Sequence, residues 1–181
     1  MSAGSHISDE DLVVEIRTKQ KERFGELVRR YQNKLMRYAM TLTHDMERSQ
    51  DIVQESFISA YVHLNGYDTK RKFSSWMYRI VHNTAINQNK KYTTHTPIQH
   101  AIDIPSDEDI EQNFTKQELQ HMVRSCLDSL PLLYREPLEL SFIEEVSYED
   151  ISDILRIPMG TVATRINRAK LYMKHLCEKN N

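Results

Sequence analysis

The sequence contains few helix-breaking residues, few cysteines and no long apolar run. Its 181 residues include only four glycines and five prolines, so the chain has few obligatory breaks. No apolar stretch approaches the ~20 residues of a membrane-spanning helix, and the first residues lack the apolar core of a signal peptide. With 39% hydrophobic and 28% charged residues, the composition is typical of a soluble globular protein. We therefore expect a cytoplasmic protein with no membrane insertion.

Patterns of metal-ligating and catalytic residues are also sparse. Cys126 and Cys177 lie far apart in the sequence, which favours two reduced thiols over a disulfide. The eight histidines show no paired ligand spacing, and His95 and His100 lie in a polar stretch where solvated side chains are a simpler interpretation than a zinc site. Neither a candidate nucleophile nor a pair of acid and base carboxylates is recognisable. We predict no metal, no cofactor and no catalytic residue, and hence a protein that is not an enzyme.

Apolar residues recur at helical spacing along most of the chain, which predicts an all-α protein. One long helix is expected from Phe24 to Leu42, and Asp45 can cap the next one. A third helix should run from Phe73 to Lys91. We assign residues 1–91 to a first small helical domain.

Residues 92–115 have no amphipathic period and contain two prolines and five acids. This composition predicts a flexible acidic linker. Helical order resumes after it, and we assign residues 116–181 to a second small helical domain. Pro131 should end its first helix, and Pro137 lies inside the next one, where we expect a kink or a late helix start.

The last third of the chain has the spacing of a helix-turn-helix. Ser147 with Asp150 three residues later is a capping signal for a short helix. Arg156 and Ile157 then supply the turn, and Pro158 suits the first turn of a longer helix. This order predicts a helix-turn-helix within the second domain.

The long final helix should carry a DNA-reading face. At about 100° per residue, the side chains of Thr164, Asn167 and Arg168 lie opposite the apolar stripe that begins at Val162. Arginine and asparagine can pair with guanine and adenine edges in the major groove. Flanking cations can contact phosphates, and the candidates are Arg165, Lys170 and Lys174. An ordinary basic surface helix is the alternative.

Three segments together resemble the extracytoplasmic-function (ECF) sigma factors, the promoter-specificity subunits of bacterial RNA polymerase. They are DIVQESF (51–57), FSSWMYRIVHN (73–83) and GTVATRINRAK (160–170). The resemblance extends from about residue 22 to residue 176, whereas the first dozen residues match nothing in the family. It implies a protein that binds core RNA polymerase and promoter DNA, and it leaves open an anti-sigma factor as a further partner.

The resemblance also implies roles for residues of the first domain. The helix with the DxxQExF pattern would dock on the largest polymerase subunit through Asp51, Gln54, Glu55 and Phe57. Asp51 and Glu55 share a helix face at spacing i, i+4, which is unfavourable unless a cation outside the chain meets it. A solvated helix face is the alternative.

A second set of residues would hold the melted promoter element, with the loop at residues 65–70 capturing a flipped base. Interleaved aromatic and basic side chains suit single strands. Phe73 and Trp76 also fit an apolar stripe, so burial in the core is the alternative for both. The candidates are Asn65, Tyr67, Lys70, Arg71, Lys72, Trp76, Arg79, Asn83 and Asn87.

A free-standing helix-turn-helix regulator is the alternative to a sigma factor. Such a regulator would bind promoter duplex without polymerase, because the helix-turn-helix alone indicates DNA binding and not a role in initiation.

Overall fold

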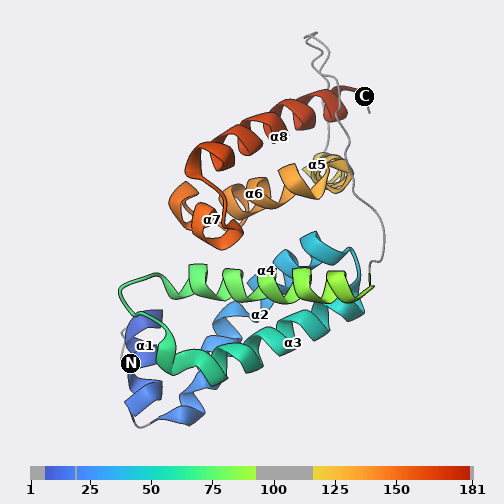
Figure 1. Cartoon of the computed structure of the whole chain (residues 1–181). Helices are drawn as coiled ribbons and strands as arrows, with labels where there is room; N and C mark the ends of the chain where they lie inside the picture. The colour runs from blue at the N-terminus through green and yellow to red at the C-terminus, as the bar shows by residue number, and fades with distance from the viewer. Residues whose placement is uncertain (1–6, 19, 93–115, 180–181) are drawn as a thin grey trace. The chain divides into compact units, whose positions relative to one another are not determined.

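The computed structural model describes residues 7–18, 20–92 and 116–179 (Figure 1). These residues form eight α-helices and two short 3-10 helices, and they contain no strand. The predicted all-α fold is therefore confirmed. The chain divides into two compact units, with α1 to α4 in the first and α5, α6, α8 and most of α7 in the second.

In the first unit, each of the helices α2, α3 and α4 packs against the other two. Helix α1 contacts α2 and the 3-10 helix η2. The predicted helix from Phe24 and the predicted helix from Phe73 begin at those residues. The elements are α1 (Asp9–Thr18), η1 (Lys21–Arg23), α2 (Phe24–Thr43), α3 (Met46–His63), η2 (Leu64–Gly66) and α4 (Phe73–Tyr92).

A tight corner joins α2 to α3. His44 ends α2 in the left-handed conformation, with φ of 53°, and its backbone NH donates to the carbonyl of Met40. The predicted cap at Asp45 is confirmed, because its Oδ1 accepts a hydrogen bond of 3.1 Å from the backbone NH of Arg48. Such a cap typically contributes about 1 kcal/mol, so this local sequence fixes where α3 begins.

The core of the first unit is rich in aromatic side chains. Tyr38 and Tyr78 are fully buried and meet edge to face, with ring centroids 5.3 Å apart. Phe73 is also fully buried and lies edge to face against Tyr31 and Tyr67. Aromatic pairs of this geometry add about 0.5–1.5 kcal/mol beyond the burial of their area. The ring of Phe73 therefore fixes the start of α4 against α2 and the preceding loop.

In the second unit, α8 packs against both α5 and α6. The first part of its predicted apolar stripe is buried, since Val162, Ile166 and Ala169 have no exposed area, whereas Met173 and Leu176 further along the stripe are half-buried. Ile151 and Ile154 of α7 are also fully buried. The predicted helix-turn-helix is therefore present as α7, a turn and α8. The elements are α5 (Lys116–Ser129), α6 (Leu132–Phe142), α7 (Tyr148–Leu155) and α8 (Met159–Lys179).

Helix α6 tolerates a proline in its interior. The expectation of a late helix start at Pro137 is wrong, because α6 begins at Leu132. Pro131 precedes the helix and its carbonyl accepts from the backbone NH groups of Tyr134 and Arg135 at 2.9 and 3.0 Å. An interior proline costs about 3 kcal/mol. The packing of α6 on α8 offsets that cost, which local sequence reasoning did not include.

Three charged side chains of α6 are buried: Arg135, Glu136 and Glu139 are only 5–7% exposed. Arg135 donates from Nη1 to the backbone carbonyl of Asp128 at 2.9 Å. Burial lowers the pKa of the Arg135 guanidinium, and the charge of Glu139 opposes this shift. A guanidinium group stays protonated in proteins, so Arg135 is a buried cation.

The predicted linker, residues 92–115, lies outside the described residues except for Tyr92, which ends α4. Its flexibility stays a prediction. The independence of the two predicted domains, residues 1–91 and 116–181, also stays a prediction.

Candidate polymerase and nucleic-acid interfaces

Local hydrogen bonds set the direction of α8. The hydroxyl of Ser147 accepts from the backbone NH of Asp150 at 3.2 Å, so the predicted capping residue begins α7. Arg156 ends α7 in the left-handed conformation, with φ of 54°. The carbonyl of Pro158 then accepts from the NH groups of Thr161 and Val162 at 2.8 and 3.1 Å. The turn between the two helices is thus fixed by residues of the turn itself.

The side chains predicted to read DNA lie on the outer surface of α8. Thr164, Asn167 and Arg168 are exposed, while Val162 and Ile166 of the same helix are buried. This is the outward placement that the helical spacing predicted. The hydroxyl of Thr164 donates to the carbonyl of Gly160 at 2.8 Å, which orients its methyl group and oxygen on the helix surface.

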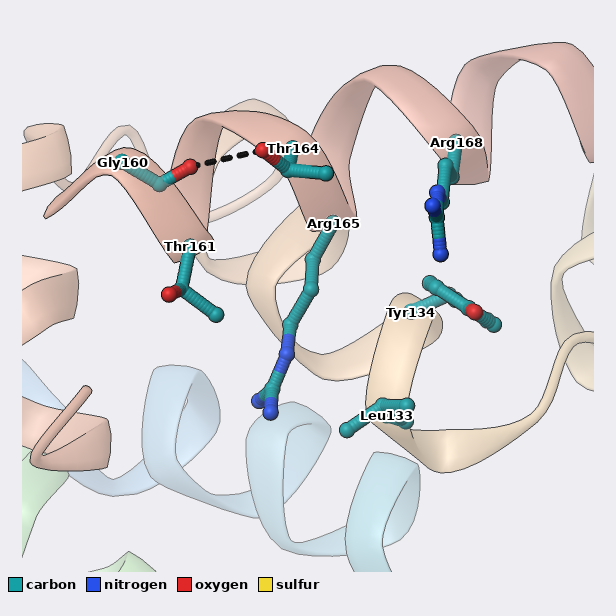
Figure 2. Close-up of a pocket in the computed structure, with 7 residues that line it drawn as sticks. All are labelled: Leu133, Tyr134, Gly160, Thr161, Thr164, Arg165 and Arg168. Carbon is teal, nitrogen blue, oxygen red and sulfur yellow. Dashed lines mark hydrogen bonds between the residues drawn. The ribbon is translucent and has the colours of Figure 1, made fainter. Parts of the chain in front are cut away.

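A hollow of about 280 Å³ lies between α8 and the start of α6 (Figure 2). Thr164, Arg165 and Arg168 line it from α8, and Arg168 points toward the ring of Tyr134 from α6. Leu133, which is 48% exposed, completes the apolar side of the hollow. Sequence reasoning missed Leu133 and Tyr134, because they belong to a different helix.

The other three candidates of α8 occupy a second flank of the helix. At about 100° per residue, the side chains of Asn167, Lys170 and Lys174 fall within about 60° of one another around the helix axis. They lie roughly 60–180° around that axis from the first flank, which consists of Thr164, Arg165 and Arg168. All three are exposed. The ammonium of Lys170 lies 4.6 Å from the ring centroid of Phe142, a cation-π distance. The six candidates therefore form two groups of three.

Helix α3 presents the predicted polymerase-binding carboxylates to solvent. Asp51, Gln54 and Glu55 are exposed. Phe57 differs, because its side chain is only 9% exposed and lies on the buried face of α3 with Val53. This placement argues against a direct contact of Phe57 with a partner and corrects the interpretation based on the motif. Its ring instead belongs to the core.

Two further residues of α3 extend the surface of Asp51 and Glu55. Ile58 and Val62 are 59% and 64% exposed, and the spacing 51, 55, 58, 62 places all four on one helix face. Tyr61, 46% exposed, lies beside them, with its ring 5.1 Å from that of Phe24. Sequence reasoning missed Ile58 and Val62 as part of this surface. The feature that could have identified them is their apolar character at positions outside the apolar stripe of α3.

The loop before α4 combines exposed and buried candidates. Asn65, Lys70, Arg71 and Lys72 are exposed. Tyr67 is only 4% exposed, and its hydroxyl donates to the backbone carbonyl of Arg71. Burial raises the pKa of Tyr67, which keeps the hydroxyl protonated. Its ring is therefore part of the core and not available for stacking on a base, contrary to the expectation from sequence.

Helix α4 carries the remaining candidates for the melted element. Trp76 and Arg79 are half-buried, and the indole of Trp76 lies on the ring of Tyr67 with centroids 5.0 Å apart. Asn83 is half-buried and Asn87 is exposed one helical turn further on. Trp76 thus packs against the aromatic core and remains partly accessible to solvent.

A hollow of about 270 Å³ between α3 and α4 joins residues that the sequence assigned to separate surfaces. Glu55, predicted to bind polymerase, lines it together with Asn83 and Asn87, predicted to bind DNA. Gln88 donates from Nε2 to Glu55 Oε2 at 2.8 Å. Helices α3 and α4 are thus connected through side chains.

No described helix is long and apolar enough to cross a membrane. Among the described residues, no group of three or more histidine, cysteine or acidic side chains could hold a metal ion.

The chain is similar to known proteins over most of its length. Residues 27–94 match the family described as Sigma-70 region 2, and residues 120–173 match Sigma-70, region 4. The chain is 34% identical to the ECF RNA polymerase sigma-E factor of Haemophilus influenzae, over 91% of this chain and 92% of that protein. It is 30% identical to the ECF RNA polymerase sigma factor SigW of Bacillus subtilis, over 87% and 90%.

Two solved structures share the fold. CnrH, in complex with the cytosolic domain of CnrY, is 22% identical with a TM-score of 0.70, covering 96% of this chain and 99% of that chain. RpoE of Bartonella quintana, in complex with the anti-sigma factor NepR, is 19% identical with a TM-score of 0.66, covering 87% and 98%. Taken with the sequence identities and the region 2 and region 4 matches, the chain belongs to the family of ECF RNA polymerase sigma factors.

Proposed function

We propose that the two units divide the work of a sigma factor. The protein binds core RNA polymerase and directs promoter-specific initiation, as its family does. The first unit would bind polymerase and the melted downstream element, and the second would read the upstream duplex. The observation that carries this division is the exposure of a separate set of candidate side chains on each unit, within the segments that match regions 2 and 4.

Helix α8 is suited to the major groove of the upstream element. A groove about 12 Å wide admits an α-helix about 10–12 Å in diameter. Arg168 and Asn167 would contact base edges, and Thr164 could contact either a base or a thymine methyl group. Phosphates would then be met by the cations that flank them, Arg165, Lys170 and Lys174. The hollow beside Tyr134 would hold Arg168 near its site.

The loop before α4 and the outer face of α4 are suited to an unpaired strand. Asn65 and Lys70 are exposed on the loop, and the partly exposed Trp76 lies in a segment that also carries the exposed Arg71 and Lys72. Unstacking a base costs a few kcal/mol, which stacking and hydrogen bonds must offset. Arg79, Asn83 and Asn87 would continue the path along α4.

The exposed face of α3 is suited to protein binding. Asp51 and Glu55 supply negative charge, Gln54 supplies hydrogen bonds, and Ile58 and Val62 supply apolar area. Protein interfaces combine an apolar centre with polar groups that set orientation. This face would dock on core polymerase.

The chemistry of transcription would belong to polymerase alone, so we infer that the chain is not itself an enzyme. It would act in the cytoplasm, where bacterial RNA polymerase works. An anti-sigma factor is a candidate partner, since the related fold of Bartonella quintana RpoE was solved with one.

Run-off transcription with purified core polymerase tests the proposal. Adding the protein should start transcripts at a defined set of promoters, and mapping their ends would identify the promoter elements. Absence of association with core polymerase at micromolar concentration would contradict it. Sequence-specific binding of promoter duplex by the protein alone would instead favour the free-standing regulator.

A further inference from the structure

Helix α1 makes polar contacts with both ends of the loop that precedes α4. The match to Sigma-70 region 2 begins at residue 27, so α1 (Asp9–Thr18) lies outside it. Two side chains of α1 reach the backbone of residues 64–73. They are Glu10 and Arg17.

Arg17 holds the beginning of the loop. Its Nε donates to the carbonyl of Leu64 at 2.9 Å, and its Nη2 donates to the carbonyls of Leu64 and Tyr67. The guanidinium carbon also lies 5.8 Å from the centroid of the Tyr67 ring. The planar, forked donor set of arginine suits simultaneous contact with two carbonyls and a ring face.

Glu10 holds the end of the loop. Its Oε1 accepts a hydrogen bond of 2.9 Å from the backbone NH of Phe73, the first residue of α4. The first NH groups of a helix have no partner within the helix, so an acceptor here also caps α4. This contact joins residues 63 positions apart in the sequence.

The two anchors lie on one face of α1. Residues seven apart differ by about 20° around a helix axis and lie about 10 Å apart along it. Glu10 and Arg17 therefore reach the two ends of the loop from a single rigid helix.

The anchored positions are buried and the positions between them are exposed. Leu64 and Tyr67 are 4% exposed and Phe73 is fully buried, whereas Asn65, Lys70 and the two residues that follow it are exposed. Within the loop, the Asp68 carboxylate accepts from the backbone NH of Lys70 at 3.0 Å. The loop thus has a fixed base and side chains that project from it.

We propose that Glu10 and Arg17 are positioning residues that pre-organise the loop at residues 64–73 for the unpaired promoter strand. This inference rests on the proposed function of the loop. Pre-organised binding loops lose less entropy when the ligand binds, so affinity and base discrimination both depend on the anchors.

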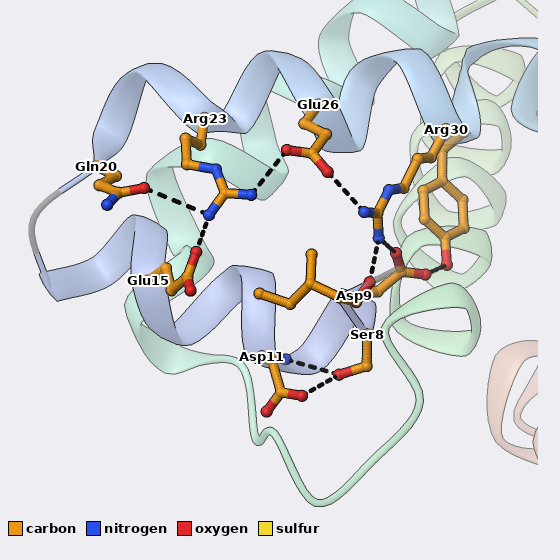
Figure 3. A network of polar contacts seen from close by, with 10 residues as sticks. Ser8, Asp9, Asp11, Glu15, Gln20, Arg23, Glu26 and Arg30 are labelled. Carbon is orange, nitrogen blue, oxygen red and sulfur yellow. Dashed lines mark hydrogen bonds and ion pairs between the residues drawn. The ribbon is translucent and has the colours of Figure 1, made fainter. Parts of the chain in front are cut away.

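A separate polar network attaches α1 to η1 and α2, and it supplies a matched control (Figure 3). Arg30 pairs with Asp9 and Glu26, each at 2.6 Å, and Arg23 pairs with Glu26 at 3.0 Å and with Glu15. Arg23 has no contact with the loop among those recorded for the described residues. Arg23→Gln therefore loosens α1 without touching the loop.

Hydrogen exchange in the free protein tests the anchors without DNA. Arg17→Ala and Glu10→Ala should speed exchange of the loop amides by roughly tenfold, the effect of losing about 1.4 kcal/mol. Glu10→Gln should exchange as the unchanged protein does, because its amide oxygen still accepts from Phe73. Equal acceleration by Arg23→Gln would overturn the proposal, since α1 would then act only as a general support.

Binding of promoter DNA tests the consequence. The probe is a mapped promoter fragment whose downstream element is held open by mismatches, bound by each variant assembled on core polymerase. Arg17→Ala and Glu10→Ala should weaken binding of this probe about tenfold and reduce the preference for the natural bases over altered ones, while Arg23→Gln and Glu10→Gln change neither. Failure of the unchanged protein to prefer the opened probe would overturn the function proposed for the loop. Unchanged binding and exchange in Arg17→Ala and Glu10→Ala would overturn the role of the anchors.

Discussion

The two units hold their candidate DNA-binding side chains in different ways. In the second unit, all six belong to α8, so their relative positions follow from the helix itself. In the first unit, they belong to a loop and to α4, and the loop is anchored by α1, a segment about fifty residues earlier in the chain. A duplex groove accepts a preformed helix, whereas an unpaired base must be met by a shaped surface. We therefore expect the first unit to depend on long-range contacts for recognition, and the second to depend on them mainly for stability.

The largest expected effect concerns the interior of the second unit. Arg135→Met should lower the free energy of unfolding by about 3 kcal/mol, because Glu136 and Glu139 would remain buried without this cation. Circular dichroism in urea would measure it. Trp76, the single tryptophan, reports on the first unit, so its fluorescence transition should not move if the two units unfold independently, as predicted. Arg124→Met is the control, since Arg124 and its partner Asp128 are 46% and 40% exposed and such pairs contribute less than about 1 kcal/mol. An equal shift in both variants would contradict the prediction.

The next effect concerns the docking face of the first unit. Replacing Asp51, Gln54 and Glu55 together by alanine should weaken binding to core polymerase at least a hundredfold, or about 2.8 kcal/mol, because the charged and polar contacts are lost together. A pull-down with purified core polymerase measures this, and circular dichroism checks the fold.

The control for this triple variant of α3 replaces Gln32 and Asn33, which are exposed on α2, by alanine. That variant should bind polymerase normally. If the triple variant still binds core polymerase in the pull-down, the proposal that α3 is the docking helix is wrong.

A smaller effect distinguishes base contacts from phosphate contacts on α8. Arg168→Ala should lose about 1–3 kcal/mol on the preferred upstream element and relax the preference at one base position. Lys174→Ala should weaken all sequences alike and reduce the salt dependence by about one unit. Competition binding at several salt concentrations separates the two. A sequence-dependent effect at Lys174 would mean that the reading face of α8 is assigned wrongly.

The smallest effect is a pH dependence in the first unit. The hydrogen bond from Arg23 and the contacts with Arg30 lower the pKa of Glu26 below its ordinary 4.5. A lowered folded-state pKa adds stability that is fully present above the ordinary value of about 4.5, and this stability is lost as the pH falls below that value and through the lower folded-state pKa. Glu26→Gln should therefore be less stable than the unchanged protein near pH 7, and this difference should shrink near pH 3. Urea unfolding followed by Trp76 fluorescence measures it at both pH values, and a difference that persists unchanged near pH 3 would contradict the prediction.

The sequence by itself determined the features that depend on local spacing. The apolar period placed α2, α4 and α8, and Asp45 and Ser147 marked where α3 and α7 begin, because a cap needs only its own residue and the next three. The outward placement of Thr164, Asn167 and Arg168 was predictable for the same reason. The motifs of regions 2 and 4 identified the family, which the spacing of apolar residues alone would not have identified.

Only the tertiary structure decided which side chains are available and what holds them. Tyr67 and Phe57 were expected at interfaces but are buried, since a loop tyrosine and a motif phenylalanine are drawn into a core formed by other helices. Tyr134 meets Arg168, and Arg17 meets Tyr67, across sequence separations that no helical period encodes. Periodicity specifies which face of a helix is apolar, whereas packing between helices decides what that face covers and which polar groups it brings together.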